Sequence, residues 1–180
     1  MRQLLNGLFL LAACLVTPVW AETRDVETYF FQPKLGDFKA DLDTVKKEGK
    51  KGIFLFFEMD ECPWCARMKA TILNQSAVQD YYRRNFLVYA VDVKGDAPMT
   101  DFTGKATTEK AFALENRVRA TPTMLFIDPS GKILTRLTGS TRSADEMLLL
   151  ARYVVEDDYK QMPFTKYKQF KPAAPPPRAQ

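Results

Sequence analysis

Two cysteines separated by two residues come between a run of apolar residues and a segment with helical periodicity. The apolar run is Ile53-Phe54-Leu55-Phe56-Phe57, which is typical of a strand covered on both faces. The cysteines lie in Cys62-Pro63-Trp64-Cys65, and Pro63 suits the first position of a helix, where a missing N–H costs nothing. We therefore predict that a buried strand turns into a helix with Cys62 at its N-terminus.

This position favours redox chemistry of the two thiols. A thiolate at a helix N-terminus faces unpaired backbone N–H groups and the positive end of the helix dipole. We predict that Cys62 is the exposed nucleophile and that Cys65, one turn inward, is the resolving thiol. An inert disulfide and a metal site shared between molecules are the alternatives. Within one chain, zinc would need four ligands, whereas the sequence has 3 cysteines and no histidine.

The absence of histidine excludes further classes of function. Ser–His–Asp hydrolysis, Cys–His proteolysis, HExxH zinc catalysis and CxxCH haem attachment all require it. Acid–base catalysis is left to carboxylates, lysines, tyrosines or thiols. The net charge of +4 is well below that of a dedicated nucleic-acid binder, so we expect no nucleic-acid partner and no bound metal.

Residues 1–21 have the pattern of a signal peptide. Arg2 precedes a short apolar run, and Val19-Trp20-Ala21 offers small residues at the −3 and −1 positions of a cleavage site. The run is shorter than a membrane span needs. Alternatively, Leu11-Ala12-Ala13-Cys14 resembles a lipobox, in which Cys14 would carry lipid. Both readings predict export to the periplasm, as a free or a lipid-anchored protein.

The periodicity downstream predicts one α/β domain over residues 22–162, followed by a tail. We expect helices at 37–49, after Cys62, around 78–82, at 107–117 and at 143–158, and strands at 53–57, 87–93, 123–127 and 133–137. Residues 94–106 read as a polar loop. This order predicts a central mixed β-sheet with helices on both faces. Residues 163–180 read as a proline-rich, basic, disordered tail that is either solvated or attracted to an acidic surface.

The chain resembles the thioredoxin fold over about residues 35–157. The resemblance rests on the strand before Cys62-Pro63-Trp64-Cys65, on the second strand and on Ala120-Thr121-Pro122-Thr123 before the last two strands. The segments Phe57–Cys65, Val91–Val93, Asp101–Lys105 and Thr121–Phe126 are also similar to those of exported SoxW-type thioredoxin-like proteins of bacteria.

The resemblance implies roles for residues away from the thiols. It implies a cis Thr121–Pro122 bond packed against the thiols, and a Thr121 backbone that pairs with an extended substrate segment. The chain departs from ordinary thioredoxins at Trp64, which replaces a small residue between the cysteines, and we expect Trp64 to shield the thiols and to contact protein substrates. Phe56 stands where thioredoxins carry a buried aspartate that relays protons. Glu58 is the nearest substitute as a proton acceptor, although it can equally be a solvated carboxylate at a strand end.

We therefore expect a monomeric, exported thiol–disulfide oxidoreductase whose only cofactor is its own Cys62–Cys65 disulfide. Its partners would be protein thiols and disulfides, with electrons from a membrane reductant. The acids Glu58, Asp60 and Glu61 oppose a Cys62 thiolate, and Arg67 and Lys69 offset them in part. This balance favours a reductant. A disulfide oxidase or isomerase, or a binding module without redox chemistry, is the alternative.

Overall fold

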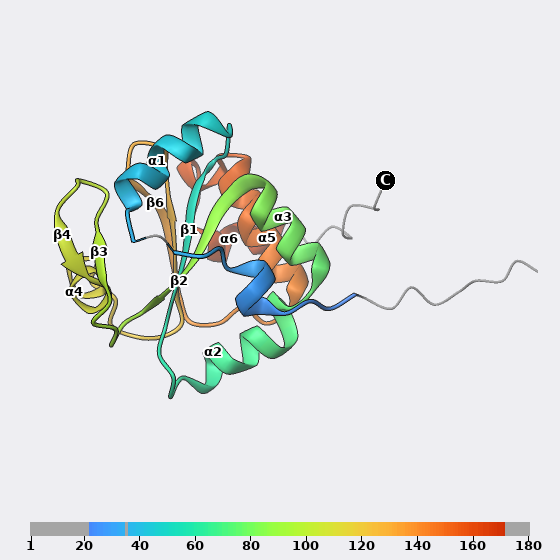
Figure 1. The fold of residues 1–180 in the computed structure, drawn as a ribbon. Helices are drawn as coiled ribbons and strands as arrows, with labels where there is room; N and C mark the ends of the chain where they lie inside the picture. Colours follow the sequence, from blue (N-terminus) through green and yellow to red (C-terminus); the bar gives the residue numbers. More distant parts are fainter. Residues whose placement is uncertain (1–21, 35, 172–180) are drawn as a thin grey trace, which may run out of the picture.

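A computed structural model describes residues 22–34 and 36–171, so the predicted signal peptide and Cys14 lie outside the described residues. Figure 1 shows helices packed around a central sheet. In chain order the elements are η1 (Val26–Phe30), α1 (Phe38–Lys47), β1 (Gly52–Glu58), α2 (Pro63–Met68), η2 (Lys69–Leu73), α3 (Ser76–Asn85), β2 (Phe86–Asp92), β3 (Pro98–Thr100), β4 (Ala106–Thr108), α4 (Glu109–Glu115), β5 (Thr123–Ile127), β6 (Ile133–Thr138), α5 (Ala144–Val155), η3 (Asp158–Lys160) and α6 (Phe164–Phe170).

The main sheet has the strand order β2-β1-β5-β6. Strands β1 and β2 are parallel, whereas β5 is antiparallel to both β1 and β6. The predicted mixed sheet is therefore confirmed. A tight turn at Asp128-Pro129-Ser130-Gly131 joins β5 and β6, and in it the N–H of Gly131 donates to the carbonyl of Asp128 at 3.0 Å.

Strand β1 is buried on both faces because its side chains alternate between two apolar clusters. Phe54 and Phe56 point into a cluster with residues of α2, α3 and α5. Ile53, Leu55 and Phe57 point into a second cluster with residues of α1 and α4. The helices thus cover both faces, and Figure 1 shows α3 and α5 side by side beyond the central strands.

The segment before the predicted fold is part of the core. Phe30 and Phe31 are buried, and the Phe31 ring lies 5.9 Å from that of Phe56. The carbonyl of Glu22 accepts the N–H of Ser76 at 2.9 Å, which ties the segment to the start of α3. Residues 22–34 therefore extend the apolar cluster on the α2 side of the sheet.

The predicted polar loop at 94–106 is in part wrong, because β3 and β4 form a two-stranded hairpin there. The turn is held by Asp101, whose Oδ1 accepts the N–H groups of Thr103 at 2.7 Å and Lys105 at 3.0 Å. Strands of three residues are too short to show a clear alternation of apolar and polar side chains.

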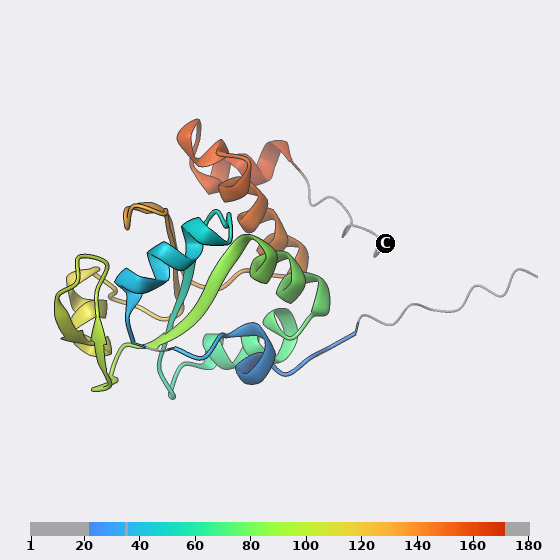
Figure 2. The same cartoon turned by 45° about the horizontal axis from the view of Figure 1, so that its top comes forward.

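The predicted disordered tail from residue 163 is also in part wrong, because α6 packs on α5 (Figure 2). Phe164 and Tyr167 are buried, and both rings contact Tyr153 of α5. Two basic side chains of the segment pair with acids instead of remaining free. Lys168 pairs with Glu146, and Lys171 lies 3.1 Å from Glu156. Apolar packing and ion pairs thus order residues 164–170.

Candidate active site

Cys62 and Cys65 are joined by a disulfide at the N-terminus of α2, with their Cα atoms 5.2 Å apart. Cys62 is the N-cap of this helix and Pro63 occupies its first turn, as predicted. The N–H of Cys65 donates to Sγ of Cys62 at 3.1 Å. A backbone donor of the first turn therefore already points at the sulfur that would carry negative charge in the reduced state.

The prediction that Cys62 is exposed is wrong for the disulfide form. Cys62 is 4% exposed and Cys65 is 2% exposed. Bonding to Cys65 holds the Cys62 sulfur against the cluster that contains Met68 and Phe56. In the disulfide form both cysteines are therefore almost completely covered.

Trp64 lies between the two cysteines and is 58% exposed. The guanidinium carbon of Arg67 lies 5.8 Å from its ring centroid, and Nη2 of Arg67 donates to the carbonyl of Arg142 at 3.3 Å. The charge of Arg67 is thus directed towards the ring and a carbonyl. Trp64 presents a large apolar surface beside the disulfide, where a protein partner can contact it.

Thr121–Pro122 is a cis peptide bond, as the family resemblance implied. It lies immediately before β5, and Thr123 of β5 pairs with Phe57 near the end of β1. The loop that leads to Cys62 and the turn that carries Pro122 therefore meet at the same end of the two central strands. Pro122 is buried, Thr121 is half-buried, and the carbonyl of Pro122 accepts the N–H of Gly139 at 2.8 Å.

Glu58 ends β1 and forms an ion pair with Lys69 of η2, with 2.6 Å between Oε2 and Nζ. Burial raises the pKa of Glu58, while the hydrogen bond and charge of Lys69 oppose that rise. Lys69 also lies 2.7 Å from a carboxylate oxygen of Glu27, on the N-terminal segment. Glu58 is therefore a partly buried, paired carboxylate and not a freely solvated one. No spacing in the sequence indicates Lys69 as the partner of Glu58, since the two residues are eleven positions apart.

The other acids near the disulfide differ in their surroundings. Glu61 pairs with Lys94 at 2.9 Å on the surface, and this hydrogen bond lowers the pKa of Glu61. Asp60 is exposed. Two of the three acids expected to oppose a thiolate, Glu58 and Glu61, therefore each pair with a lysine. The charges of Arg67 and Lys69 are directed towards the Trp64 ring and towards carboxylates, and not towards the sulfurs. Local side-chain charges largely offset one another.

The described residues contain no group of three or more histidine, cysteine, aspartate or glutamate side chains that could hold a metal ion. Within the same part of the chain, no helix is both long enough and apolar enough to cross a membrane. The candidate site therefore consists of the Cys62–Cys65 disulfide, the exposed ring of Trp64, the cis Thr121–Pro122 turn and the paired carboxylate of Glu58.

Comparisons with known proteins agree with this geometry. A family model described as a thioredoxin-like domain matches residues 38–155. A thioredoxin from Thermus thermophilus is 27% identical, with a TM-score of 0.51, and the match covers 66% of this chain and 84% of that one. None of the curated proteins is a significant match to the sequence.

Two further solved structures are similar in fold. A thioredoxin-fold protein from Helicobacter pylori is 22% identical, with a TM-score of 0.54, and the match covers 67% of this chain and 86% of that one. The DsbH oxidoreductase is 21% identical, with a TM-score of 0.55, and the match covers 74% of this chain and 90% of that one. At this level of identity the likeness concerns the fold.

Proposed function

The chain belongs to the family of thioredoxin-like domains and is a thiol–disulfide oxidoreductase, and we propose that it reduces protein disulfides outside the cytoplasm through Cys62 and Cys65. The observation that carries this proposal is the disulfide at the N-terminus of α2, with the N–H of Cys65 directed at Sγ of Cys62. This donor, together with the helix N-terminus, stabilises a thiolate on Cys62 in the reduced protein.

In the first step, the Cys62 thiolate attacks one sulfur of a substrate disulfide. A bond forms between Cys62 and that sulfur, the substrate S–S bond breaks, and the second substrate sulfur leaves as a thiolate that takes a proton from water. Trp64 contacts the substrate, and the backbone of Thr121 pairs with its extended segment. Backbone pairing of this kind, as between two β-strands, provides affinity that does not depend on the side chains of the substrate.

In the second step, Cys65 loses its proton and attacks Sγ of Cys62. The Cys62–Cys65 disulfide forms, and the first substrate sulfur is released as a thiolate. Glu58 is the proposed acceptor of the Cys65 proton, since it is partly buried and burial raises its pKa. The substrate has then gained two electrons, and a membrane-bound dithiol reductant must return the protein to its reduced form. No other cofactor is required.

The reducing direction follows from the charges around Cys62. Strong oxidants stabilise their thiolate with added positive charge, whereas Arg67 is directed at the Trp64 ring and Lys69 at two carboxylates. With little added charge, the thiolate is stabilised mainly by the helix N-terminus. The disulfide is then harder to reduce, and the dithiol is the better electron donor.

The compartment is proposed from the sequence alone. Residues 1–21 have the pattern of an export signal, and Cys14 lies in a sequence that resembles a lipobox. Similarity to SoxW-type proteins supports a role in keeping a protein of the cell envelope reduced, in sulfur oxidation or cytochrome maturation. We propose a monomer with protein substrates and no nucleic-acid partner. The intact mass of the protein from an envelope fraction distinguishes cleavage, lipidation and a full-length cytosolic form, the last of which contradicts export.

The activity is tested by insulin reduction with dithiothreitol as the electron source. Wild-type protein should accelerate the precipitation of insulin chains, whereas Cys62→Ser should act no faster than dithiothreitol alone. Cys65→Ser should lose multiple turnover because the mixed disulfide is not resolved. Equal rates for all three proteins would mean that the fold serves binding without redox chemistry.

A further inference from the structure

Residues 22–34 precede the part of the chain that matches the thioredoxin-like family, which begins at Phe38. They nevertheless contact η2, which continues the helix that carries Cys65, and Figure 2 shows this segment in blue against the helices. The N–H of Arg24 donates to the carbonyl of Asn74 at 2.8 Å, and its guanidinium lies 2.5 Å from a carboxylate oxygen of Asp80. The N-terminal segment is therefore fixed beside the candidate active site.

Glu27 of this segment reaches Lys69, which is already paired with Glu58. Nζ of Lys69 lies 2.7 Å from Oε1 of Glu27 and 2.6 Å from Oε2 of Glu58. The side chain of Glu58 is 16% exposed, whereas that of Glu27 is 59% exposed. One ammonium group thus balances two carboxylates, one of them on the buried side near Cys65 and the other in water.

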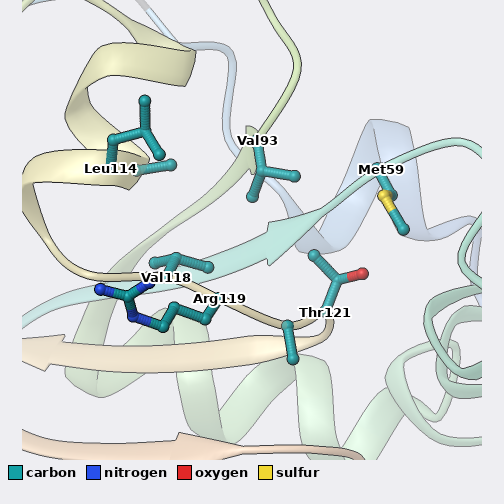
Figure 3. Close-up of a pocket in the computed structure, with 8 residues that line it drawn as sticks. Met59, Val93, Leu114, Val118, Arg119 and Thr121 are labelled. Carbon is teal, nitrogen blue, oxygen red and sulfur yellow. The ribbon is translucent and has the colours of Figure 1, made fainter.

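These ion pairs lie on a different surface from the cis-proline turn. A groove of about 480 Å³ between the N-terminal segment and the helical run is open to solvent, and both Glu27 and Lys69 line it. The cavity of about 170 Å³ beside the turn is instead lined by Met59 and Thr121 (Figure 3). Neither Glu27, Glu58 nor Lys69 lines that cavity. Water can therefore reach the outer side of Lys69 away from the turn.

Glu27 and Lys69 act on Glu58 in opposite directions. Burial raises the pKa of Glu58, Lys69 lowers it again, and the like charges of Glu27 and Asp92 raise it. Asp92 is the neighbour of Glu58 on β2. Among the described residues, Lys34 also faces Glu58, and its own partner is a different carboxylate. Because Asp92 and Lys34 belong to other elements, a change at Glu27 alters only the charge that Lys69 shares.

We propose that Glu27 is a positioning residue for the second chemical step: it shares Lys69 with Glu58, so that Glu58 stays basic enough to take the proton of the resolving thiol. The proposal rests on the proposed function and deepens it, because it concerns the same site. The proton passes from Cys65 to Glu58, the Cys65 thiolate bonds to Sγ of Cys62, and the substrate sulfur leaves as a thiolate. If Lys69 paired with Glu58 alone, the carboxylate would be a weaker base and this step would be slower.

The test compares Glu27→Gln with Glu22→Gln in the full-length protein. Glu22 lies on the same segment and is exposed, but it pairs with Arg24, so its substitution removes one negative charge without removing a partner of Lys69. The first readout is the pKa of Glu58 in the disulfide form, from ¹³C NMR of the glutamate carboxyl carbons with Glu58→Gln to assign the signal. The second is the rate at which a mixed disulfide releases the substrate thiol, measured as a function of pH.

We expect Glu27→Gln to lower the pKa of Glu58 by about 0.5 to 1 and to move the slowing of thiol release to lower pH by the same amount. Above both pKa values, release should be about two- to threefold slower than in wild type, because Glu58 is a weaker base. Glu27→Asp should restore most of the wild-type profile, and Glu22→Gln should leave both readouts unchanged. Lys69→Met should shift both in the opposite direction.

An unchanged pKa of Glu58 in Glu27→Gln, or an equal shift in Glu22→Gln, would overturn the role of Glu27. A pKa that shifts while the rate profile stays in place would overturn both this role and Glu58 as the proton acceptor. If reduced wild-type protein did not react with a disulfide substrate at all, the proposed function would fail, and the role of Glu27 in the step would fail with it.

Discussion

The ammonium group of Lys69 lies 2.6 Å from a carboxylate oxygen of Glu58 at the end of β1. Lys69 follows Cys65 by four residues on the same helical run, so both lie on one face of it. Glu58 follows Phe56 by two residues and therefore projects from the same face of β1 as Phe56, which packs in the cluster that contains Cys65. The ion pair thus occupies the side of the sheet where Cys65, the proposed resolving thiol, lies.

The pH dependence of the second chemical step tests Glu58 as a proton acceptor. Burial raises the pKa of Glu58, and its protonated form at lower pH cannot accept the Cys65 proton. We expect release of the substrate thiol to slow as pH falls through this pKa. Glu58→Gln should slow the step by about 10- to 100-fold near neutral pH and remove this part of the profile. Lys69→Met should move the slowing of this step to higher pH, because the Lys69 charge that holds down the pKa of Glu58 is lost.

Lys94→Met is the control, since Lys94 pairs with the exposed Glu61. It should leave the profile in place. A Glu58→Gln variant with wild-type rates and an unchanged profile would show that Glu58 has only a structural role. Stability gives a second readout. A raised pKa in the folded state contributes stability at low pH that is lost as pH rises through that pKa, and Glu58→Gln should remove this loss.

The docking of α6 predicts a stability effect in a segment that the sequence suggested was disordered. Tyr167 is 2% exposed and its ring lies 5.0 Å from that of Tyr153, whereas Phe170 is 65% exposed. Tyr167→Ala should lower the free energy of unfolding by about 3 kcal/mol, because it leaves a cavity against α5. Phe170→Ala should change it by no more than about 0.5 kcal/mol. Urea denaturation of both variants would show equal midpoints if α6 did not dock.

Lys34 provides the charge that balances a buried carboxylate. Its ammonium group pairs with Glu109 and donates to the carbonyl of Ala90 at 3.1 Å, and Glu109 is almost fully buried. Lys34→Met should destabilise the fold by about 3 kcal/mol, because Glu109 is left without its partner. Lys34→Met combined with Glu109→Gln should recover most of that loss. Lys46→Met is the control, since it removes only an exposed ion pair with Asp43, and it should lower the free energy of unfolding by about 0.5 kcal/mol or less. Chemical denaturation of all three variants measures these differences.

The parts of the fold that have strong local patterns could be predicted from the sequence. The continuous apolar run of β1 and the position of Pro63 identify a buried strand followed by a helix that begins at Cys62. The Asp128-Pro129-Ser130-Gly131 turn identifies the hairpin of β5 and β6. The cis form of Thr121–Pro122 came from the family resemblance and is confirmed.

The parts that depend on distant contacts could not be predicted. The helix α6 is ordered by packing on Tyr153 of α5, and nothing in residues 164–170 alone shows that contact. Burial of Cys62 depends on the disulfide and the cluster beneath it. The pairing of Glu58 with Lys69 could not be predicted, because the turn between β1 and α2 brings the two residues together and sequence spacing does not.

The reduction potential tests the proposed direction of electron flow. Because Arg67 and Lys69 are directed away from the sulfurs, we expect a value near thioredoxin's about −270 mV and not near DsbA's about −120 mV. Neutralising Glu58, Asp60 and Glu61 together should raise the potential, and a change of about 30 mV corresponds to about 1.4 kcal/mol. The reduction potential is measured by equilibration with glutathione, with Trp64 fluorescence or thiol alkylation as the readout of the reduced fraction. A potential above roughly −160 mV would favour an oxidase instead.

Covalent capture of a substrate tests most directly whether Cys62 is the nucleophile. Reduced Cys65→Ser protein is mixed with a disulfide-bonded protein substrate, quenched with acid and analysed by mass spectrometry. We expect one substrate molecule linked through Cys62, and release of the substrate thiol when dithiothreitol is added. Cys62→Ser should form no more than a trace of this adduct under the same conditions. An adduct that forms equally at Cys65 in the Cys62→Ser variant, or no adduct in either, would contradict the assignment of Cys62 as the attacking thiol.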